Sequence, residues 1–216
     1  MLTNSSTYLA ELTQALRLLD LQAIERLSNV LHRAYLRNRT VFFIGNGGSA
    51  STASHLATDF SKLTTRPGQA RLRCMALADS VSALTAAGND FSYEEVFVEQ
   101  LRTFMQPGDV VVGISTSGRS KNVLKAFEYA NRCGAITFGI TGVEGEALRA
   151  VSADSISIAS LSVQQIEDVT TVAGHMACLA TREKCLATER PAGIEDARSQ
   201  PSAGAPASAV NMDPAA

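Results

Sequence analysis

The sequence has no tryptophan, only three histidines and four cysteines, and no strong excess of charge of either sign. Its net charge of −2 gives no general reason to expect nucleic acid or an anionic membrane as a partner. No apolar run approaches the roughly 18 residues of a membrane span, and the N-terminus lacks the pattern of a signal peptide. The scattered cysteines have no C-x-x-C spacing, which favours reduced thiols. We therefore expect a cytoplasmic protein that contacts neither nucleic acid nor membrane.

The 216 residues, of which 45% are hydrophobic and 19% charged, suffice for one domain with a substantial core. From residue 40 onward, short apolar stretches alternate with longer stretches of helical periodicity. This alternation predicts an α/β fold, with helices on both faces of a mostly parallel, five-stranded sheet. The expected strands are Val41–Ile44, Cys74–Leu77, Val110–Ile114, Ile136–Ile140 and Ser155–Ile158, and the expected helices lie near 50–62, 80–87, 93–104, 119–132, 144–150 and 163–187.

Two segments flank this domain, which we expect to span residues 39–187. Leucines and alanines at helical spacing predict one or two amphipathic helices over residues 7–36, within an N-terminal helical segment 1–38. The last stretch, 188–216, is rich in Pro, Ala, Ser and Gly and has almost nothing large to bury. We expect it to be a disordered tail.

Two glycine- and hydroxyl-rich loops follow predicted strands. The first is the turn GNGGS at residues 45–49, which opens a helix; close backbone approach and free N–H groups there suit an anion. The second, GISTSGRS at residues 113–120, can donate hydrogen bonds to phosphate oxygens beside a helix N-terminus. It lacks the Walker spacing, which argues against nucleotide triphosphates, and its hydroxyls are also typical of ordinary caps and turns.

Four titratable side chains could supply chemistry beside these loops. His55 and Asp59 share one helical face, and Glu167 and His175 share another over about two turns. Imidazole and carboxylate can serve as acid and base near neutral pH. A histidine in the apolar segment VAGHMACLA is also typical of a satisfied core histidine, and spacing alone leaves open whether the two helices meet.

The ordered motifs GNGGSA, His55, GND at 88–90, STSGRS at 115–120 and Gly174-His175 resemble the sugar isomerase (SIS) domain family, and within it the phosphoheptose isomerases. The resemblance implies a three-layer α/β/α sandwich, assembled as a homotetramer with active sites at subunit interfaces. The N-terminal helices would then pack on both the domain and the oligomer. The implied activity is aldose–ketose isomerisation of sedoheptulose 7-phosphate or a closely related sugar phosphate through an enediol, without a nucleotide or organic cofactor.

The resemblance also implies roles for individual residues. Asp59 matches the general base of the family, and His175 matches its general acid. Some members bind zinc, and the matching ligand set is His55, Asp59, Glu167 and His175. The implied substrate contacts are Asn46, Gly47, Ser49, Asp90, Ser115, Thr116, Ser117, Ser120 and Glu167.

At four positions the sequence departs from the family pattern. Asp59 replaces a Glu, which shortens the reach of the carboxylate by one bond, ~1.5 Å. Glu167 replaces a Gln and adds negative charge that a dication would offset. Gln164 stands where the family commonly has a substrate-contacting Asp. Leu63 stands where the family often has a basic residue after the helix that carries His55 and Asp59. These changes predict an altered sugar end of the site. They also keep open a non-catalytic sugar-phosphate-sensing or protein-binding module, of the DnaA initiator-associating type, although such a module needs neither the acid nor the base.

Overall fold

Five short apolar segments form a sheet through the centre of the molecule, of which the computed structural model describes residues 4–190. The sheet has the order β2-β1-β3-β4-β5, and every neighbouring pair is parallel. All five strands overlap their predicted positions. They are β1 (Thr40–Gly45), β2 (Arg73–Ala76), β3 (Val110–Ile114), β4 (Ile136–Gly142) and β5 (Asp154–Ile158).

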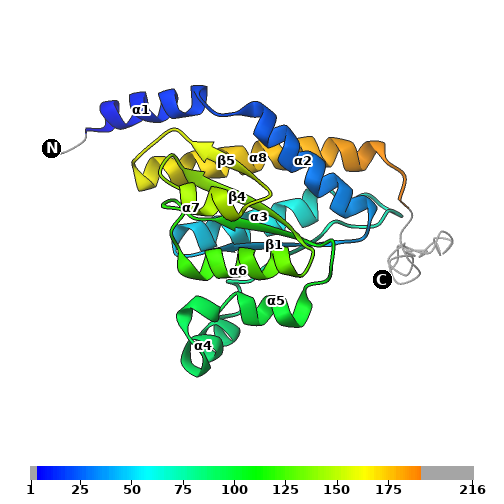
Figure 1. Cartoon of the computed structure of the whole chain (residues 1–216). Helices are drawn as coiled ribbons and strands as arrows, with labels where there is room; N and C mark the ends of the chain where they lie inside the picture. The colour runs from blue at the N-terminus through cyan, green and yellow to red at the C-terminus, as the bar shows by residue number, and fades with distance from the viewer. Residues whose placement is uncertain (1–3, 191–216) are drawn as a thin grey trace, which may run out of the picture.

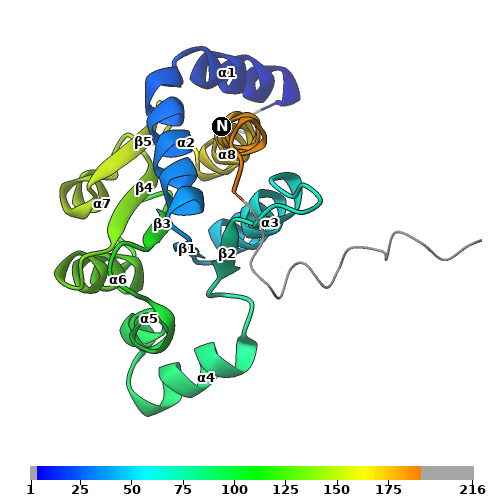
Figure 2. The same cartoon turned by 90° about the vertical axis from the view of Figure 1, so that its right-hand side faces the viewer.

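Helices cover both faces of this sheet, because successive strand residues point to opposite sides. Val41 and Phe43 of β1 pack into one buried cluster, and Phe42 and Ile44 pack into the other. One layer consists of α1 (Ser5–Arg17), α2 (Leu21–Leu36), α3 (Gly48–Leu63) and α8 (Val163–Ala187). The other consists of α4 (Val81–Asp90), the 3-10 turn η1 (Tyr93–Glu95), α5 (Val98–Phe104), α6 (Lys121–Arg132) and α7 (Glu146–Val151). The predicted three-layer α/β/α sandwich is confirmed (Figures 1 and 2).

Two helical segments show how local chemistry sets the boundaries. Residues 7–36 form two helices, because the Asp20 carboxylate accepts hydrogen bonds from the backbone N–H groups of Gln22 and Ala23 and so starts α2. The single helix predicted near 93–104 is wrong. Val96, Phe97 and Val98 are all buried in succession, which one amphipathic helix face cannot achieve, and the chain there divides into η1 and α5.

The order of the strands places the two glycine-rich loops next to each other. β1 and β3 are neighbours in the sheet, and the loops at residues 46–49 and 115–120 follow their carboxyl ends. Within residues 4–190, no helix is long and apolar enough to cross a membrane. The predicted disorder of the tail lies, from residue 191 onward, outside the described residues.

Candidate functional site

The site is built on α3 and α8, which lie side by side and run parallel. Near its start, α3 brings Gly48 against Glu167 of α8, and further along Leu56 lies against Gly174. A Cβ atom added to Gly174 would lie only 2.5 Å from Cδ2 of Leu56, so the glycine permits the two helices to approach closely. The residues beside this contact, His55 and His175, consequently meet between the helices.

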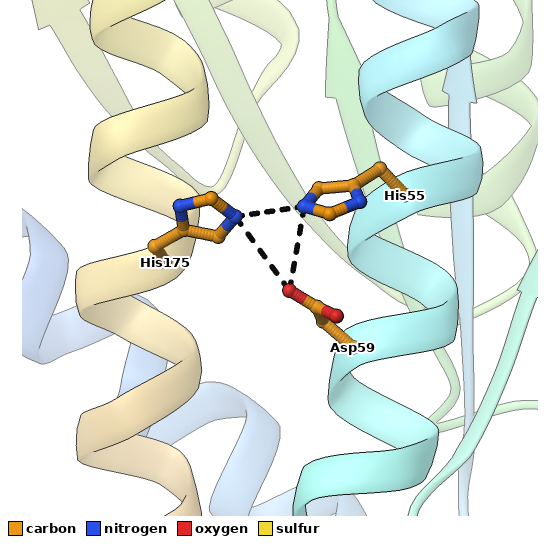
Figure 3. A group of neighbouring side chains, drawn as sticks. All are labelled: His55, Asp59 and His175. Atoms are coloured by element: carbon orange, nitrogen blue, oxygen red, sulfur yellow. Dashed lines mark hydrogen bonds and ion pairs between the residues drawn. The ribbon is translucent and has the colours of Figure 1, made fainter.

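Three titratable side chains converge in the space between α3 and α8 (Figure 3). Nε2 of His55 lies 2.7 Å from Nε2 of His175. Oδ2 of Asp59 lies 3.4 Å from the first of these nitrogens and 3.6 Å from the second. The His175 side chain is 47% exposed, so the alternative of a core histidine is wrong.

Two imidazole nitrogens at hydrogen-bond distance can share only one proton, with one ring donating and the other accepting. The Asp59 carboxylate lies beside both rings, where its negative charge would stabilise a protonated imidazole of either histidine. The arrangement of His55, Asp59 and His175 therefore suits proton transfer at the surface of α3 and α8.

The same three residues offer a set of metal ligands, since one ligand atom from each lies within 4.8 Å of the others. Two imidazoles and a carboxylate are ligands that zinc prefers, and three protein ligands leave a fourth position open. Zinc–nitrogen bonds of about 2.05 Å in a tetrahedral site require the two Nε2 atoms to be roughly 3.4 Å apart. The residues fit a zinc ion if the histidines separate from their present 2.7 Å.

Glu167, the fourth expected ligand, lies apart from this group. Eight residues of helix separate it from His175, which corresponds to about 12 Å along the axis. Its carboxylate instead lies over the first turn of α3, where a Cβ atom on Gly48 would be 2.2 Å from Oε1. A carboxylate is favourable there because the N–H groups of the first turn carry partial positive charge, and the N-cap residue Gly47 supplies no side-chain cap.

The second loop retains the features of an anion cradle. The Oγ atoms of Ser115 and Ser120 lie 3.0 Å apart, and Ser117 Oγ accepts a hydrogen bond from the Arg119 N–H at 3.2 Å. Ser120 is the N-cap of α6 but makes no side-chain cap hydrogen bond, which leaves N–H groups of the first turn available. A small cavity of about 150 Å³ adjoins the loop and is lined in part by Thr116 and Ser117.

The first loop is tied to the second by the Asn46 side chain, which hydrogen bonds to Asn122 at the start of α6. Ser49 is buried in the first turn of α3. Asp90 lies exposed at the end of α4 and accepts a hydrogen bond from its neighbour Asn89. The structure thus brings Asn46 and Ser115–Ser120 together.

Three of the four departures from the family pattern, Glu167 and two further residues, lie away from the three titratable side chains. Leu63 is partly buried and packs against the core. Gln164 is exposed at the start of α8, where Ser162 Oγ donates to its Oε1 at 3.4 Å. Sequence reasoning missed Asn122 and Tyr93, which contact Asn46. The available signal for Asn122 was its position two residues after the STSGRS motif.

Known proteins are similar to this chain in sequence and in architecture. A model of the SIS domain matches residues 7–142. The probable phosphoheptose isomerase of Thermoplasma volcanium is 38% identical over 177 residues, which cover 82% of this chain and 90% of that protein. The phosphoheptose isomerase of Desulfovibrio desulfuricans is 41% identical over 147 residues, 67% of this chain and 69% of that protein. The structure of phosphoheptose isomerase from Neisseria gonorrhoeae matches with a TM-score of 0.76 at 27% identity, covering 82% of this chain and 96% of that chain.

The fold and the site define an α/β protein with two glycine- and hydroxyl-rich loops at adjacent strand ends and a His/Asp group on the helices beside them. The family model spans more than half of the chain. The protein belongs to the SIS domain family.

Proposed function

We propose that the protein is an aldose–ketose isomerase that interconverts sedoheptulose 7-phosphate, or a closely related ketose phosphate, with the corresponding aldose phosphate. The family and the relatives make it an isomerase enzyme of sugar phosphates. The observation that carries the proposal is the convergence of His55, Asp59 and His175 on helices that begin or pass beside the two anion-binding loops.

The substrate phosphate binds at the second loop in this proposal. Ser115, Thr116, Ser117 and Ser120 donate from hydroxyl and backbone groups, and the first turn of α6 adds partial positive charge. Asn46, Gly47 and Ser49 contact the substrate from the first loop, and Asp90 and Glu167 complete the expected contacts. Anchoring the phosphate fixes the position of the reacting carbons relative to α3.

The reaction moves a proton between C1 and C2 through an enediol. Asp59 removes the proton from one carbon and returns it to the other, while His175 moves a proton at the sugar oxygens. In the metal-free protein, the imidazole of His55 orients His175 through the 2.7 Å contact between their Nε2 atoms. Exposure of roughly half of each histidine leaves these groups reachable by substrate.

We propose that the same group of His55, Asp59 and His175 can alternatively hold a zinc ion, in which case the two Nε2 atoms bind the metal and no longer contact each other. A bound zinc ion would polarise the sugar carbonyl and stabilise negative charge on its oxygen. Glu167 is outside this ligand group, so we propose a substrate contact as its role. Elemental analysis of protein purified without chelator should find about one zinc per chain, and His55→Ala should abolish it, whereas Glu167→Gln should retain it. Metal content unaffected by His55→Ala would contradict this assignment.

Self-association is proposed because the face that carries the site is apolar. Val172, Met176 and Leu179 of α8 lie beside His175 and are 39%, 37% and 54% exposed. Exposed apolar surface of this kind marks an interface, and a second copy would enclose the site. We propose a homotetramer in the cytoplasm, where all four cysteines stay as the free thiols seen in the structure. Light scattering should show Leu179→Glu shifted to smaller species, and Glu128→Lys, an exposed charge change on α6 in the opposite layer, should not.

The competing function is a sugar-phosphate sensor or protein-binding module without catalysis. The two functions separate in one assay over a panel of C5 to C8 sugar phosphates, in which isomer formation is followed by NMR. Isomerisation of at least one ketose phosphate is expected. Stabilisation of the protein by a sugar phosphate in a thermal melt, without isomerisation of any panel member, would favour the sensor.

A further inference from the structure

Asn122 is almost fully buried, at 2% exposure, yet it has no part in the mechanism above. It is the second residue of α6 and lies two residues after the end of the second loop. Its side-chain amide forms a reciprocal pair with Asn46 of the first loop: Asn46 Nδ2 donates to Asn122 Oδ1 at 2.9 Å, and Asn122 Nδ2 donates to Asn46 Oδ1 at 2.8 Å. The first loop is thus joined, side chain to side chain, to the first turn of the helix that follows the second loop.

A third residue, Tyr93, completes this arrangement. Its hydroxyl donates to Asn46 Oδ1 at 2.9 Å, although its ring is exposed. Tyr93 begins η1, which is held on α6 by ion pairs: Lys125 Nζ lies 2.8 Å from Glu94 and 3.0 Å from Glu95. The hydroxyl is therefore presented to Asn46 by a segment anchored on the same helix as Asn122.

The Asn46 side-chain amide uses only part of its hydrogen-bonding capacity within residues 4–190. A side-chain amide has an oxygen with two acceptor sites and a nitrogen with two donor sites. The oxygen accepts from both Tyr93 and Asn122, and one N–H donates to Asn122. Among residues 4–190, the second N–H has no hydrogen-bonded partner, so a donor is what Asn46 can offer to a ligand.

We infer that Asn122 and Tyr93 are positioning residues, which hold the Asn46 amide so that its free N–H faces the sugar phosphate. The inference rests on the proposed function, which places the substrate beside Asn46. The terminal torsion of an asparagine is broad and roughly two-fold. Without these partners the amide could turn its oxygen toward the substrate, where a lone pair would oppose the phosphate or hydroxyl oxygens.

A double-mutant cycle tests this role through Asn46. Tyr93→Phe removes one hydroxyl from an exposed ring and should leave the fold intact, and Asn122→Ala removes the reciprocal pair. Each should raise KM, by about fivefold for Tyr93→Phe, the effect of one hydrogen bond, with kcat changed less than twofold. In an Asn46→Ala background neither change should raise KM further, because the group they position is gone.

Matched controls come from the same helix. Tyr129→Phe and Asn131→Ala alter the same residue types at sites away from both loops, and KM should stay at the wild-type value. Wild-type KM in Tyr93→Phe and Asn122→Ala, or an equal rise in the presence and absence of Asn46, would overturn the inference while the proposed function stands. If the wild type and the controls turn over no sugar phosphate, the proposed function fails and this inference fails with it.

Discussion

Replacing Gly174 by alanine should separate the two helices that carry the candidate site. The new Cβ atom would lie 2.5 Å from Cδ2, 2.7 Å from Cδ1 and 3.1 Å from Cγ of Leu56. Leu56 is 1% exposed, so its side chain has no open space into which it could turn. Carbon atoms in contact need about 3.5–4.0 Å, so α3 and α8 must move apart by roughly 1 Å.

The expected loss of stability is small, whereas the expected loss of activity is large. Overpacking of a core costs about 1–3 kcal/mol, and the better helix propensity of alanine returns about 1 kcal/mol, so the free energy of unfolding should fall by about 1 kcal/mol. The two helices would move apart at a point next to the His55–His175 contact. A misplacement of 1 Å can lower a rate by about 100-fold.

Urea unfolding and steady-state turnover measure the two effects. Gly88→Ala is the control for stability, because its Cβ would meet only Val96 Cγ1 at an ordinary 3.8 Å; it should be as stable as the wild type or more so. The double variant Leu56→Val/Gly174→Ala removes the clashing Cδ atoms and should recover part of the turnover. Wild-type turnover in Gly174→Ala would refute the reasoning that helix spacing sets the geometry of the site.

Two further predictions concern charged groups near the loops. Gly48→Ala should displace the Glu167 carboxylate, since the new Cβ would overlap Oε1; because this carboxylate ends a flexible, partly buried side chain, a thermal melt should stay near that of the wild type, and a large loss of stability would contradict this. Hydrogen bonds from Lys125 lower the pKa of the Glu94 carboxyl below its usual 4.5. The stabilisation by this ion pair is therefore present above pH 4.5 and is lost as the pH falls through the lowered pKa. Glu94→Gln should melt below the wild type at pH 7, and the difference should vanish in acid; a constant difference would contradict this assignment.

Most of the fold was predictable because each element has a local signal. The strands are short apolar runs bounded by polar residues, and α8 begins and ends where its pattern predicts, at Val163 and Ala187. The break between η1 and α5 was not predictable in this way, because it depends on which residues the core buries in succession.

The site was predictable in its residue types but not in its arrangement. Whether His55 and His175 meet depends on the packing of Leu56 against Gly174, a contact between residues 118 positions apart. The position of Glu167 outside the group of three was not predictable, because its carboxylate lies over Gly48 through the packing of α8 on α3. The pairing of Asn46 with Asn122 follows from the strand order, which places the two loops side by side.

The central claim is that Asp59 and His175 transfer protons on a bound sugar phosphate. The most direct test is incorporation of deuterium from D₂O at C1 of sedoheptulose 7-phosphate and at C2 of the aldose product, followed by NMR for the wild type, Asp59→Asn and His175→Ala. The wild type should incorporate deuterium, and both variants should lose this exchange while a thermal melt still shows stabilisation by the sugar phosphate. Exchange at the wild-type rate in either variant would contradict it.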